Sequence, residues 1–245
     1  MQQPKQKIFA IANQKGGVGK TTTTLNLAAA IAEAGFKVLV MDLDPQGNAS
    51  TGLGSHADAR AFTTYDVLIG TQVELRFIQK TDIENIDLVP STTDLSSADI
   101  ELASAKNRSE MLRKVLSNSD LSKYDYILLD CPPSLNVLTV NALIAAHALI
   151  IPLQSEFFAL EGLSQLLMSV REVRDLGNPD LRIEGVVLTM YDARNRLSLQ
   201  VEEDARENLG ELIFKTVIPR NVRISEAPSF AMPVLSYDSR SKGAE

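Results

Sequence analysis

Cysteine and histidine are scarce in this sequence of 245 residues. It contains one cysteine, Cys131, and two histidines, His56 and His147. A single thiol cannot form a disulfide within the chain, and three such side chains are too few for the four ligands of a structural zinc site. The low thiol content fits a reducing compartment. We therefore expect Cys131 to be a small buried core residue rather than a redox sensor, and we assign no role to the histidines.

Long apolar runs and positive charge are scarce as well. No apolar run reaches the ~20 residues that span a bilayer, and the N-terminus lacks the apolar core of a signal peptide before Lys7. The chain has 31 acidic and 24 basic residues, which gives a net charge of −7. On composition alone, this balance argues against nucleic acid as a partner. We also expect no membrane partner.

Apolar, strand-like segments alternate with helix-like segments along the whole chain, and no linker divides them. Strands are expected at 8–13, 37–42, 86–89, 126–130, 148–153 and 183–189, with short late strands at 217–218 and 234–235. Helices are expected at 21–34, 97–116 and 157–176, and along the apolar face of Val201, Ala205, Leu209 and Leu212. This alternation predicts a single α/β domain over 1–245, with a mostly parallel, twisted sheet covered by helices on both faces.

A glycine-rich loop joins the first expected strand to the first expected helix. Its residues are Lys15, Gly16, Gly17, Val18, Gly19, Lys20, Thr21 and Thr22. Backbone N–H groups at a helix N-terminus are free donors, the helix dipole adds positive charge, and glycines let the backbone curl around phosphates. We predict that this loop binds a nucleoside triphosphate, that Lys20 reaches its β- and γ-phosphates, and that the Thr21 hydroxyl ligates Mg²⁺.

The loop differs from the ordinary pattern G-x-x-x-x-G-K-[ST], because Gln14 stands where the first glycine is required. It also contains a second lysine, Lys15. A glycine-rich hairpin that happens to hold two lysines is the alternative. The buried strand before the loop and the helix after it favour the phosphate loop.

Two acidic positions follow apolar strands. Asp130 ends the segment YILLD, where a carboxylate can hold Mg²⁺ directly or through water, and a cap of the next turn is the alternative. Asp44 lies in the block 42–48 after the second strand, at the sheet edge where open α/β folds bind ligands. We predict that Asp44 positions the attacking water, whereas Asp42 is structural or supports it. A plain turn is the alternative for the block.

Six blocks resemble the ParA/Soj family of deviant-Walker partition ATPases, in the order and spacing of that family. They are NQKGGVGKTTTTLNLA, DLDPQGNASTGLG, YILLDCPPSL, EFFALEGLSQLL, LTMYDAR and PRNVRISEAPS, and the match runs from about residue 7 to 243. The resemblance implies a weak ATPase with ATP and Mg²⁺ as cofactors, which forms a homodimer with two nucleotides between the protomers. It also implies non-specific DNA binding, a ParB-type partner that stimulates hydrolysis, segregation of chromosome or plasmid DNA, and a cytoplasmic, nucleoid-associated location.

The resemblance further implies the roles of single residues in hydrolysis. Lys15 resembles the signature lysine that reaches the phosphates bound to the partner protomer. Asp44 falls where the family places a residue required for hydrolysis. Together with Lys20, these two residues form the expected catalytic set.

DNA and adenine contacts are implied in the same way. Arg194 and Arg223 fall where members carry DNA-binding arginines, and Pro219 and Asn221 lie in a block that resembles the adenine pocket. Ordinary solvated surface charges are the alternative for the arginines. The window 212–225 contains basic residues and no acid. Because charges act within a Debye length of ~8 Å, the acidic total does not exclude weak, salt-sensitive DNA binding.

The resemblance has limits. Ala231 stands where the family often has glycine, the helix that usually follows the KGAE segment is absent, and only some seven residues precede the first strand, so a sequence-specific repressor role is not expected. A membrane-associated positioning ATPase of the Min type, and a ParA-like protein that positions a protein cargo, are the alternative functions. An electron-transfer ATPase like the nitrogenase iron protein would need more cysteine ligands than Cys131.

Overall fold

The described part of the chain in this computed structural model comprises residues 6–102, 107–156 and 159–245. Its strands form one seven-stranded sheet in the order β3-β4-β2-β5-β1-β6-β7. The strands are β1 (Lys7–Ile11), β2 (Val38–Asp42), β3 (Gln79–Lys80), β4 (Ile86–Val89), β5 (Tyr126–Asp130), β6 (Ala148–Gln154) and β7 (Arg182–Thr189). Neighbouring strands pair in parallel, except that β3 pairs antiparallel with β4. The predicted mostly parallel sheet is therefore confirmed.

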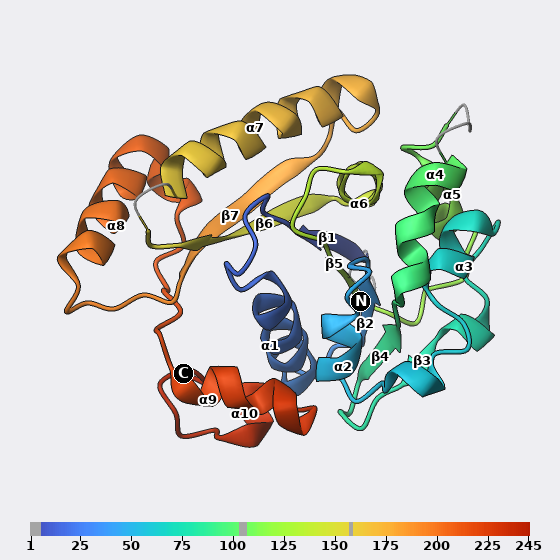
Figure 1. Cartoon of the computed structure of the whole chain (residues 1–245), viewed down its shortest axis with the longest axis horizontal. Coiled ribbons are helices and arrows are strands. Elements are labelled where there is room, and N and C mark those ends of the chain that lie inside the picture. The colour runs from blue at the N-terminus through green and yellow to red at the C-terminus, as the bar shows by residue number, and fades with distance from the viewer. Residues whose placement is uncertain (1–5, 103–106, 157–158) are drawn as a thin grey trace, which may run out of the picture.

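Helices cover both faces of this sheet, as predicted (Figure 1). They are α1 (Lys20–Glu33), α2 (Asn48–Gly52), α3 (Thr64–Ile69), α4 (Ala98–Leu102), α5 (Met111–Ser117), α6 (Val137–Ala145), α7 (Ala159–Leu176), α8 (Arg196–Leu209), α9 (Val222–Glu226) and α10 (Val234–Tyr237). Apolar residues of α1 and α2 pack on one face, and apolar residues of α3 to α8 pack on the other. None of the helices in the described part is long and apolar enough to cross a membrane.

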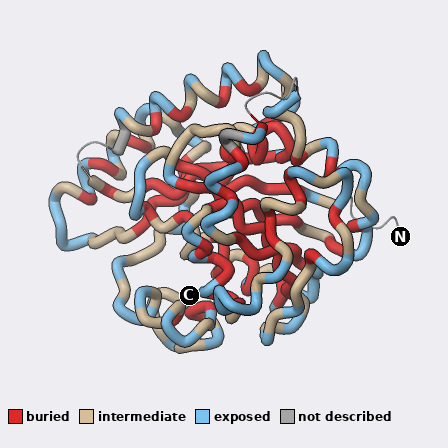
Figure 2. The backbone as a smooth tube through the Cα atoms, turned by 45° about the vertical axis from the view of Figure 1, so that its right-hand side comes forward, coloured by how far each residue is buried: buried red, intermediate tan, exposed pale blue. Residues whose placement is uncertain are grey.

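The central strands are buried on both faces, which explains their nearly continuous apolar sequences. All five residues of β2 are buried, and Figure 2 shows the strands as a buried layer inside an exposed shell of helices and loops. Cys131 follows β5 and is 1% exposed, so its predicted place in the core is confirmed. Burial in this core provides most of the driving force for folding.

Parallel pairing brings the carboxyl ends of three strands to one edge. Ile11 at the end of β1 lies opposite Asp130 in β5, and Asp42 at the end of β2 also lies opposite Asp130. The loop 12–19 leaves β1 at this same edge and leads into α1. The glycine-rich loop and both predicted acidic positions therefore meet at one place.

The helix predicted over 97–116 is wrong as one element. The structure has α4 and α5 instead, with residues 103–106 outside the described part. The side chain of the buried Asn141 from α6 accepts a hydrogen bond from the N–H of Leu112 (3.1 Å) and donates one to the carbonyl of Arg108 (2.7 Å). A tertiary contact thus fixes the start of α5, and no local pattern reveals it.

The two short late strands are also wrong. Val234–Tyr237 is the helix α10, whose first N–H is capped by the side chain of Asn26 from α1 (2.7 Å). Ile218 donates its N–H to Leu188 of β7 (2.8 Å), but only isolated bridges join this segment to the sheet. The predicted helix over 157–176 begins at Ala159, and positions 157–158 lie outside the described residues.

Candidate nucleotide-binding site

Two glycines shape the loop between β1 and α1. Gly17 and Gly19 have φ angles of 74° and 87°, a left-handed conformation that a side chain makes costly. Gly19 is also the N-cap of α1, and no side chain caps this helix end. The loop therefore presents open backbone donors where the helix dipole is positive.

Hydrogen bonds to the distant strands β6 and β7 anchor this loop. The Asn13 amide donates to the carbonyl of Pro152 (2.7 Å), and its oxygen accepts the N–H of Lys15 (3.0 Å). The Thr189 hydroxyl donates to the carbonyl of Val18 (2.8 Å). Neither anchor can be predicted from the local sequence, because Asn13 and Thr189 meet their partners only through the fold.

Lys20 lies in a buried position at the start of α1. It is 6% exposed, and its Nζ donates to the carbonyl of Lys15 (3.0 Å). Burial lowers the pKa of Lys20, while the nearby Asp130 raises it. No ion pair of the described residues engages Lys20. A buried ammonium without a paired carboxylate is suited to an anionic ligand.

The two predicted metal-binding residues lie in contact. Thr21 Oγ1 donates to Asp130 Oδ2 (2.8 Å), and Thr24 Oγ1 donates to Asp130 Oδ1 (2.8 Å). Burial, together with the nearby Asp42, raises the pKa of Asp130 to about 7. A hydroxyl and a carboxylate are hard oxygen donors of the kind that Mg²⁺ prefers, so this pair fits the ion. Thr24 was not singled out in the sequence analysis.

Asp42 and Asp44 have different surroundings. Asp42 is fully buried; its Oδ2 accepts hydrogen bonds from the N–H (2.8 Å) and the hydroxyl (2.6 Å) of Ser50, and its Oδ1 accepts the N–H of Asp44 (3.1 Å). Burial raises the pKa of Asp42 to about 6. Asp42 therefore holds the backbone of this loop and the N–H of Asp44, which fits both predicted roles, structural and supporting. Asp44 is 7% exposed and accepts the N–H of Gln46 (2.9 Å).

The second lysine of the loop lies outside this buried cluster. Lys15 Nζ forms an ion pair with Glu156 (2.6 Å), and the side chains are 42% and 46% exposed. Glu156 follows β6 and belongs to the block EFFALEGLSQLL, and no local pattern predicts its pairing with Lys15. The two lysines of the loop thus face different environments.

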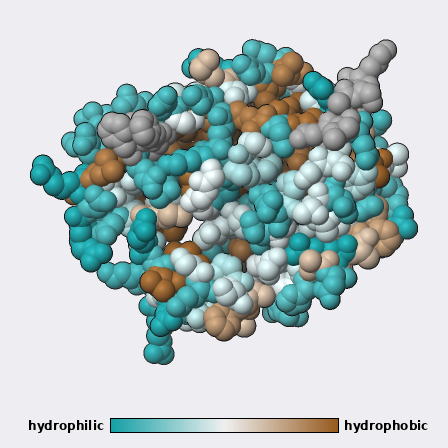
Figure 3. All heavy atoms as spheres, viewed as in Figure 1, coloured by the Kyte–Doolittle hydropathy of each residue, from teal (hydrophilic) through white to brown (hydrophobic). Residues whose placement is uncertain are grey.

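A cavity of about 440 Å³ adjoins the glycine-rich loop. Its lining includes Gly19 and Thr22 of the loop together with Pro219 and Asn221, the residues expected at the adenine. The face in Figure 3 is hollowed between α8 and the C-terminal helices. The structure therefore brings two residues of the glycine-rich loop to the same cavity as Pro219 and Asn221, whereas Lys15, Lys20 and Thr21 do not line it.

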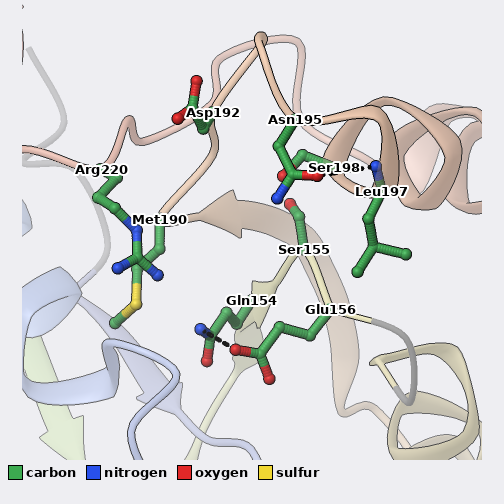
Figure 4. Close-up of a pocket in the computed structure, with 9 residues that line it drawn as sticks. All are labelled: Gln154, Ser155, Glu156, Met190, Asp192, Asn195, Leu197, Ser198 and Arg220. Carbon is green, nitrogen blue, oxygen red and sulfur yellow. Dashed lines mark hydrogen bonds between the residues drawn. The ribbon is translucent and has the colours of Figure 1, made fainter.

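A second cavity of about 450 Å³ adjoins the first and shares Met190 and Arg220 with it. Figure 4 shows Gln154 at the end of β6, with Ser155 and Glu156 directly after it, facing the β7–α8 loop and the start of α8. Ser155 is 5% exposed, and its hydroxyl has no hydrogen-bond partner among the described residues. Glu156 links this cavity to Lys15. Among these lining residues, Arg220 is one of the basic residues of the window 212–225, and no role was predicted for the others.

The two predicted DNA-binding arginines lie on the surface and carry acidic partners. Arg194 is 90% exposed in its side chain and pairs with Asp192 (2.9 Å). Arg223 pairs with Glu226 (2.8 Å) and Asp238 (3.3 Å). The window around Arg223 is free of acid in sequence, but Glu226 lies one residue beyond it on the same helix, and the fold brings Asp238 to it. Neither arginine lines the nucleotide cavity.

The chain is similar to known proteins over almost its whole length. The family model AAA_31, described as an AAA domain, matches residues 6–183. The chromosome partitioning protein ParA of Caulobacter vibrioides is 53% identical, over 98% of this chain and 90% of that protein. The sporulation initiation inhibitor protein Soj of Bacillus subtilis is 51% identical, over 98% of this chain and 94% of that protein.

Solved structures share the fold. The cobyrinic acid a,c-diamide synthase of Mycobacterium smegmatis with bound ADP and magnesium has a TM-score of 0.82 and 36% identity, with 97% of each chain covered. The cell division ATPase MinD of Pyrococcus furiosus has a TM-score of 0.78 and 30% identity, over 97% of this chain and 93% of that one. With the identities to ParA and Soj, these likenesses show that the chain belongs to the ParA/Soj family of partition ATPases.

Proposed function

We propose that this protein is an ATP-dependent switch that binds DNA and segregates chromosome or plasmid DNA together with a ParB-type partner. The observation that carries the proposal is the buried set of Lys20, Thr21 and Asp130 beside a cavity that reaches Pro219 and Asn221. A cation and hard oxygen donors next to a partly apolar cavity match the parts of a nucleoside triphosphate with Mg²⁺. The ADP and magnesium in the solved relative support this assignment.

Different residues of this chain bind the nucleotide and promote its hydrolysis. Lys20 and the loop N–H groups hold the phosphates, and Thr21 and Asp130 hold the Mg²⁺ that neutralises phosphate charge. Asp44 orients the water that attacks the terminal phosphate. Phosphoryl transfer depends mainly on such positioning and on charge stabilisation, so small displacements of Asp44 have large effects on the rate.

Lys15 acts at a second protomer. Its side chain is exposed and lies away from the Lys20 cluster, which is suited to a contact across an interface. In the ATP state two protomers enclose two nucleotides, and Lys15 exchanges Glu156 for the phosphates on the partner. An exposed ion pair contributes only about 0.2–1 kcal/mol, so phosphate can displace Glu156 readily.

The DNA contact consists of Arg194 and Arg223 from both protomers of the ATP dimer. Their exposure leaves them accessible to phosphate, and their acidic partners weaken the attraction. The expected binding is weak, salt-dependent and independent of sequence, because guanidinium–phosphate contacts carry no base information. The nucleoid would then be the location of the ATP form.

A membrane-associated ATPase of the Min type is the competing function, and the likeness to the MinD structure is the observation that favours it. The identity to MinD is 30%, against 53% and 51% to ParA and Soj, which supports the partition function.

Co-sedimentation separates these two functions. The protein is mixed with random-sequence duplex DNA or with vesicles that contain phosphatidylglycerol, in each case with ATP or ADP and Mg²⁺. We expect ATP-dependent binding to DNA and none to vesicles. ATP-dependent binding to vesicles without DNA binding would replace the partition function by the Min type.

A further inference from the structure

Arg60 connects three segments near the second acidic block. Its Nη1 donates to the carbonyl of Ser91 after β4 (2.8 Å), and its Nη2 donates to the hydroxyl of Thr51 in α2 (2.8 Å). Nε donates to the carbonyl of Ser55 (3.1 Å), which also accepts a hydrogen bond from Nη2. One guanidinium thus ties α2, the turn after it and the end of β4 together.

The segment that Arg60 holds begins directly after Asp44. Gly47 donates its N–H to the carbonyl of Asp44 (2.9 Å) and starts α2. A Cβ at Gly47 would lie 2.2 Å from Nη1 of Arg60 and 2.9 Å from the carbonyl of Ser91, and its φ of 64° is left-handed. The guanidinium therefore packs directly against the backbone that turns away from Asp44.

A second set of contacts holds the same segment from the other side. The Ser50 hydroxyl donates to Asp42 (2.6 Å) and accepts the N–H of Ser91 (2.9 Å). Asp42 in turn accepts the N–H of Asp44 (3.1 Å). Two chains of hydrogen bonds thus connect the segment around Asp44 to Ser91. One runs through Asp42 and Ser50, and the other runs through Arg60.

We propose that Arg60 is a positioning residue for Asp44: it fixes the backbone from Gly47 to Ser55, and this fixes the carboxylate that orients the attacking water. The inference rests on the proposed function, which gives Asp44 its role. Arg60 contacts none of the residues that bind the phosphates or Mg²⁺ in that function. Its effect is therefore on the rate of hydrolysis and not on the affinity for ATP.

The planar guanidinium is required because it donates at the same time to acceptors on Thr51, Ser55 and Ser91. An arginine offers five N–H donors in a rigid fork, whereas a lysine offers one ammonium group on a flexible chain. Arg60→Lys can keep one of the contacts, and Arg60→Ala keeps none. We expect kcat to fall by about 3-fold for Arg60→Lys and by about 10-fold or more for Arg60→Ala, because a displacement of about 1 Å can cost up to about 100-fold.

The test measures single-turnover hydrolysis of ATP with Mg²⁺ and random-sequence duplex DNA, and affinity for a non-hydrolysable ATP analogue. It uses the full chain, Arg60→Ala, Arg60→Lys, Asp44→Ala and the double variant Asp44→Ala with Arg60→Ala. The matched control is Arg174→Ala, since Arg174 also clasps a backbone carbonyl, that of Leu181 (2.7 Å), on a different part of the fold. Methylguanidinium is added to Arg60→Ala as a chemical substitute for the lost side chain.

The expected result is a graded loss of kcat at Arg60 with analogue affinity within about 2-fold, no further loss in the double variant, and rescue by methylguanidinium only when Asp44 is present. Losses that multiply in the double variant, or a matching loss of affinity, would overturn the inference. Unchanged hydrolysis in Arg60→Ala would overturn the inference about Arg60 and leave the proposed function standing. Unchanged hydrolysis in Asp44→Ala would instead overturn the role of Asp44 in the proposed function, and the inference with it.

Discussion

Lys20 and Lys15 lie five residues apart in the same loop, and their surroundings differ sharply. Lys20 is 6% exposed and unpaired with any described carboxylate, whereas the side chain of Lys15 is 42% exposed and pairs with Glu156. The buried lysine belongs to a set of contacts that is complete within one protomer. The exposed lysine and the exposed arginines satisfy their charge with nearby acids. In the proposed function the exposed lysine and arginines would exchange their acidic partners for phosphate, whereas Lys20 needs no such exchange.

Loss of Lys20 should have the largest effect, and it should fall on the affinity for ATP. Lys20→Ala removes the buried charge on the phosphates, and truncating one partner of a buried charge pair costs about 2–5 kcal/mol, which is roughly 30-fold to several-thousand-fold in affinity. Thr21→Ala should act in the same direction by removing a Mg²⁺ ligand. Equilibrium binding of a fluorescent ATP analogue measures both. Lys15→Ala is the matched control and should still bind; an unchanged affinity in Lys20→Ala would refute the phosphate-loop assignment.

Loss of Asp44 should separate binding from hydrolysis. Asp44→Ala should bind ATP, hydrolyse it at least about 100-fold more slowly, and accumulate as a dimer, because the water is no longer oriented. Light scattering with ATP measures the dimer. Lys15→Ala should bind ATP and stay monomeric, because its charge acts across the interface. A monomeric Asp44→Ala protein would contradict the proposed enclosure of nucleotide between protomers.

The exposed arginines should affect DNA binding alone. Each phosphate contact contributes about 0.9 to the slope of log affinity against log salt. Replacing Arg194 and Arg223 by Ala in both protomers should lower that slope by roughly 3 to 4, equally for all DNA sequences. Analogue binding should stay normal. Fluorescence anisotropy over a salt series tests this, and a double variant with its full slope would show that the DNA contact lies elsewhere.

The buried carboxyl of Asp130 should make the stability of the fold depend on pH. Because burial raises the folded-state pKa of Asp130 to about 7 from 3.8, this carboxyl stabilises the fold below pH ~4 and loses that contribution as pH rises through about 7. Asp130→Asn should therefore gain stability relative to the wild type between pH 5 and 8, by up to about a few kcal/mol. Urea unfolding without nucleotide, over a series of pH values, measures the difference in stability between Asp130→Asn and the wild type. A gap that stays constant with pH would contradict the raised pKa.

Asp87 provides the opposite control for that experiment. Burial acts to raise its pKa, but hydrogen bonds from Tyr124 (2.6 Å) and Lys80 (2.9 Å) lower it overall. A carboxyl with a lowered folded-state pKa stabilises the fold above its unfolded pKa and loses this as pH falls. Asp87→Asn should thus lose stability relative to the wild type in neutral solution and recover toward acid.

The sequence predicts the preformed part of the site better than the exposed part. Gly19, Lys20 and Thr21 lie in one short segment, and Asp130 ends an apolar strand, so their meeting at the sheet edge follows from parallel pairing. Glu226 lies three residues after Arg223 on the same helix, where the sequence alone places it, but Asp238 could not be predicted in this way, since it reaches Arg223 through the packing of α10 against α1. The same holds for Asn141, whose contacts divide the predicted helix at 97–116. Local pattern specifies local chemistry, and partners across the fold depend on tertiary packing.

The ion pair between Lys15 and Glu156 also has a consequence for how two copies of the protein meet. In the proposed dimer, a face that carried an unpaired Lys15 would repel the same face of the partner during diffusional encounter, and the encounter rate would rise with added salt. Glu156 cancels that charge until contact is made. In that dimer the Lys15–Glu156 pair adds no net charge to the approaching faces, so its contribution to the association rate should depend little on ionic strength, unlike the arginine–phosphate contacts of the proposed DNA complex.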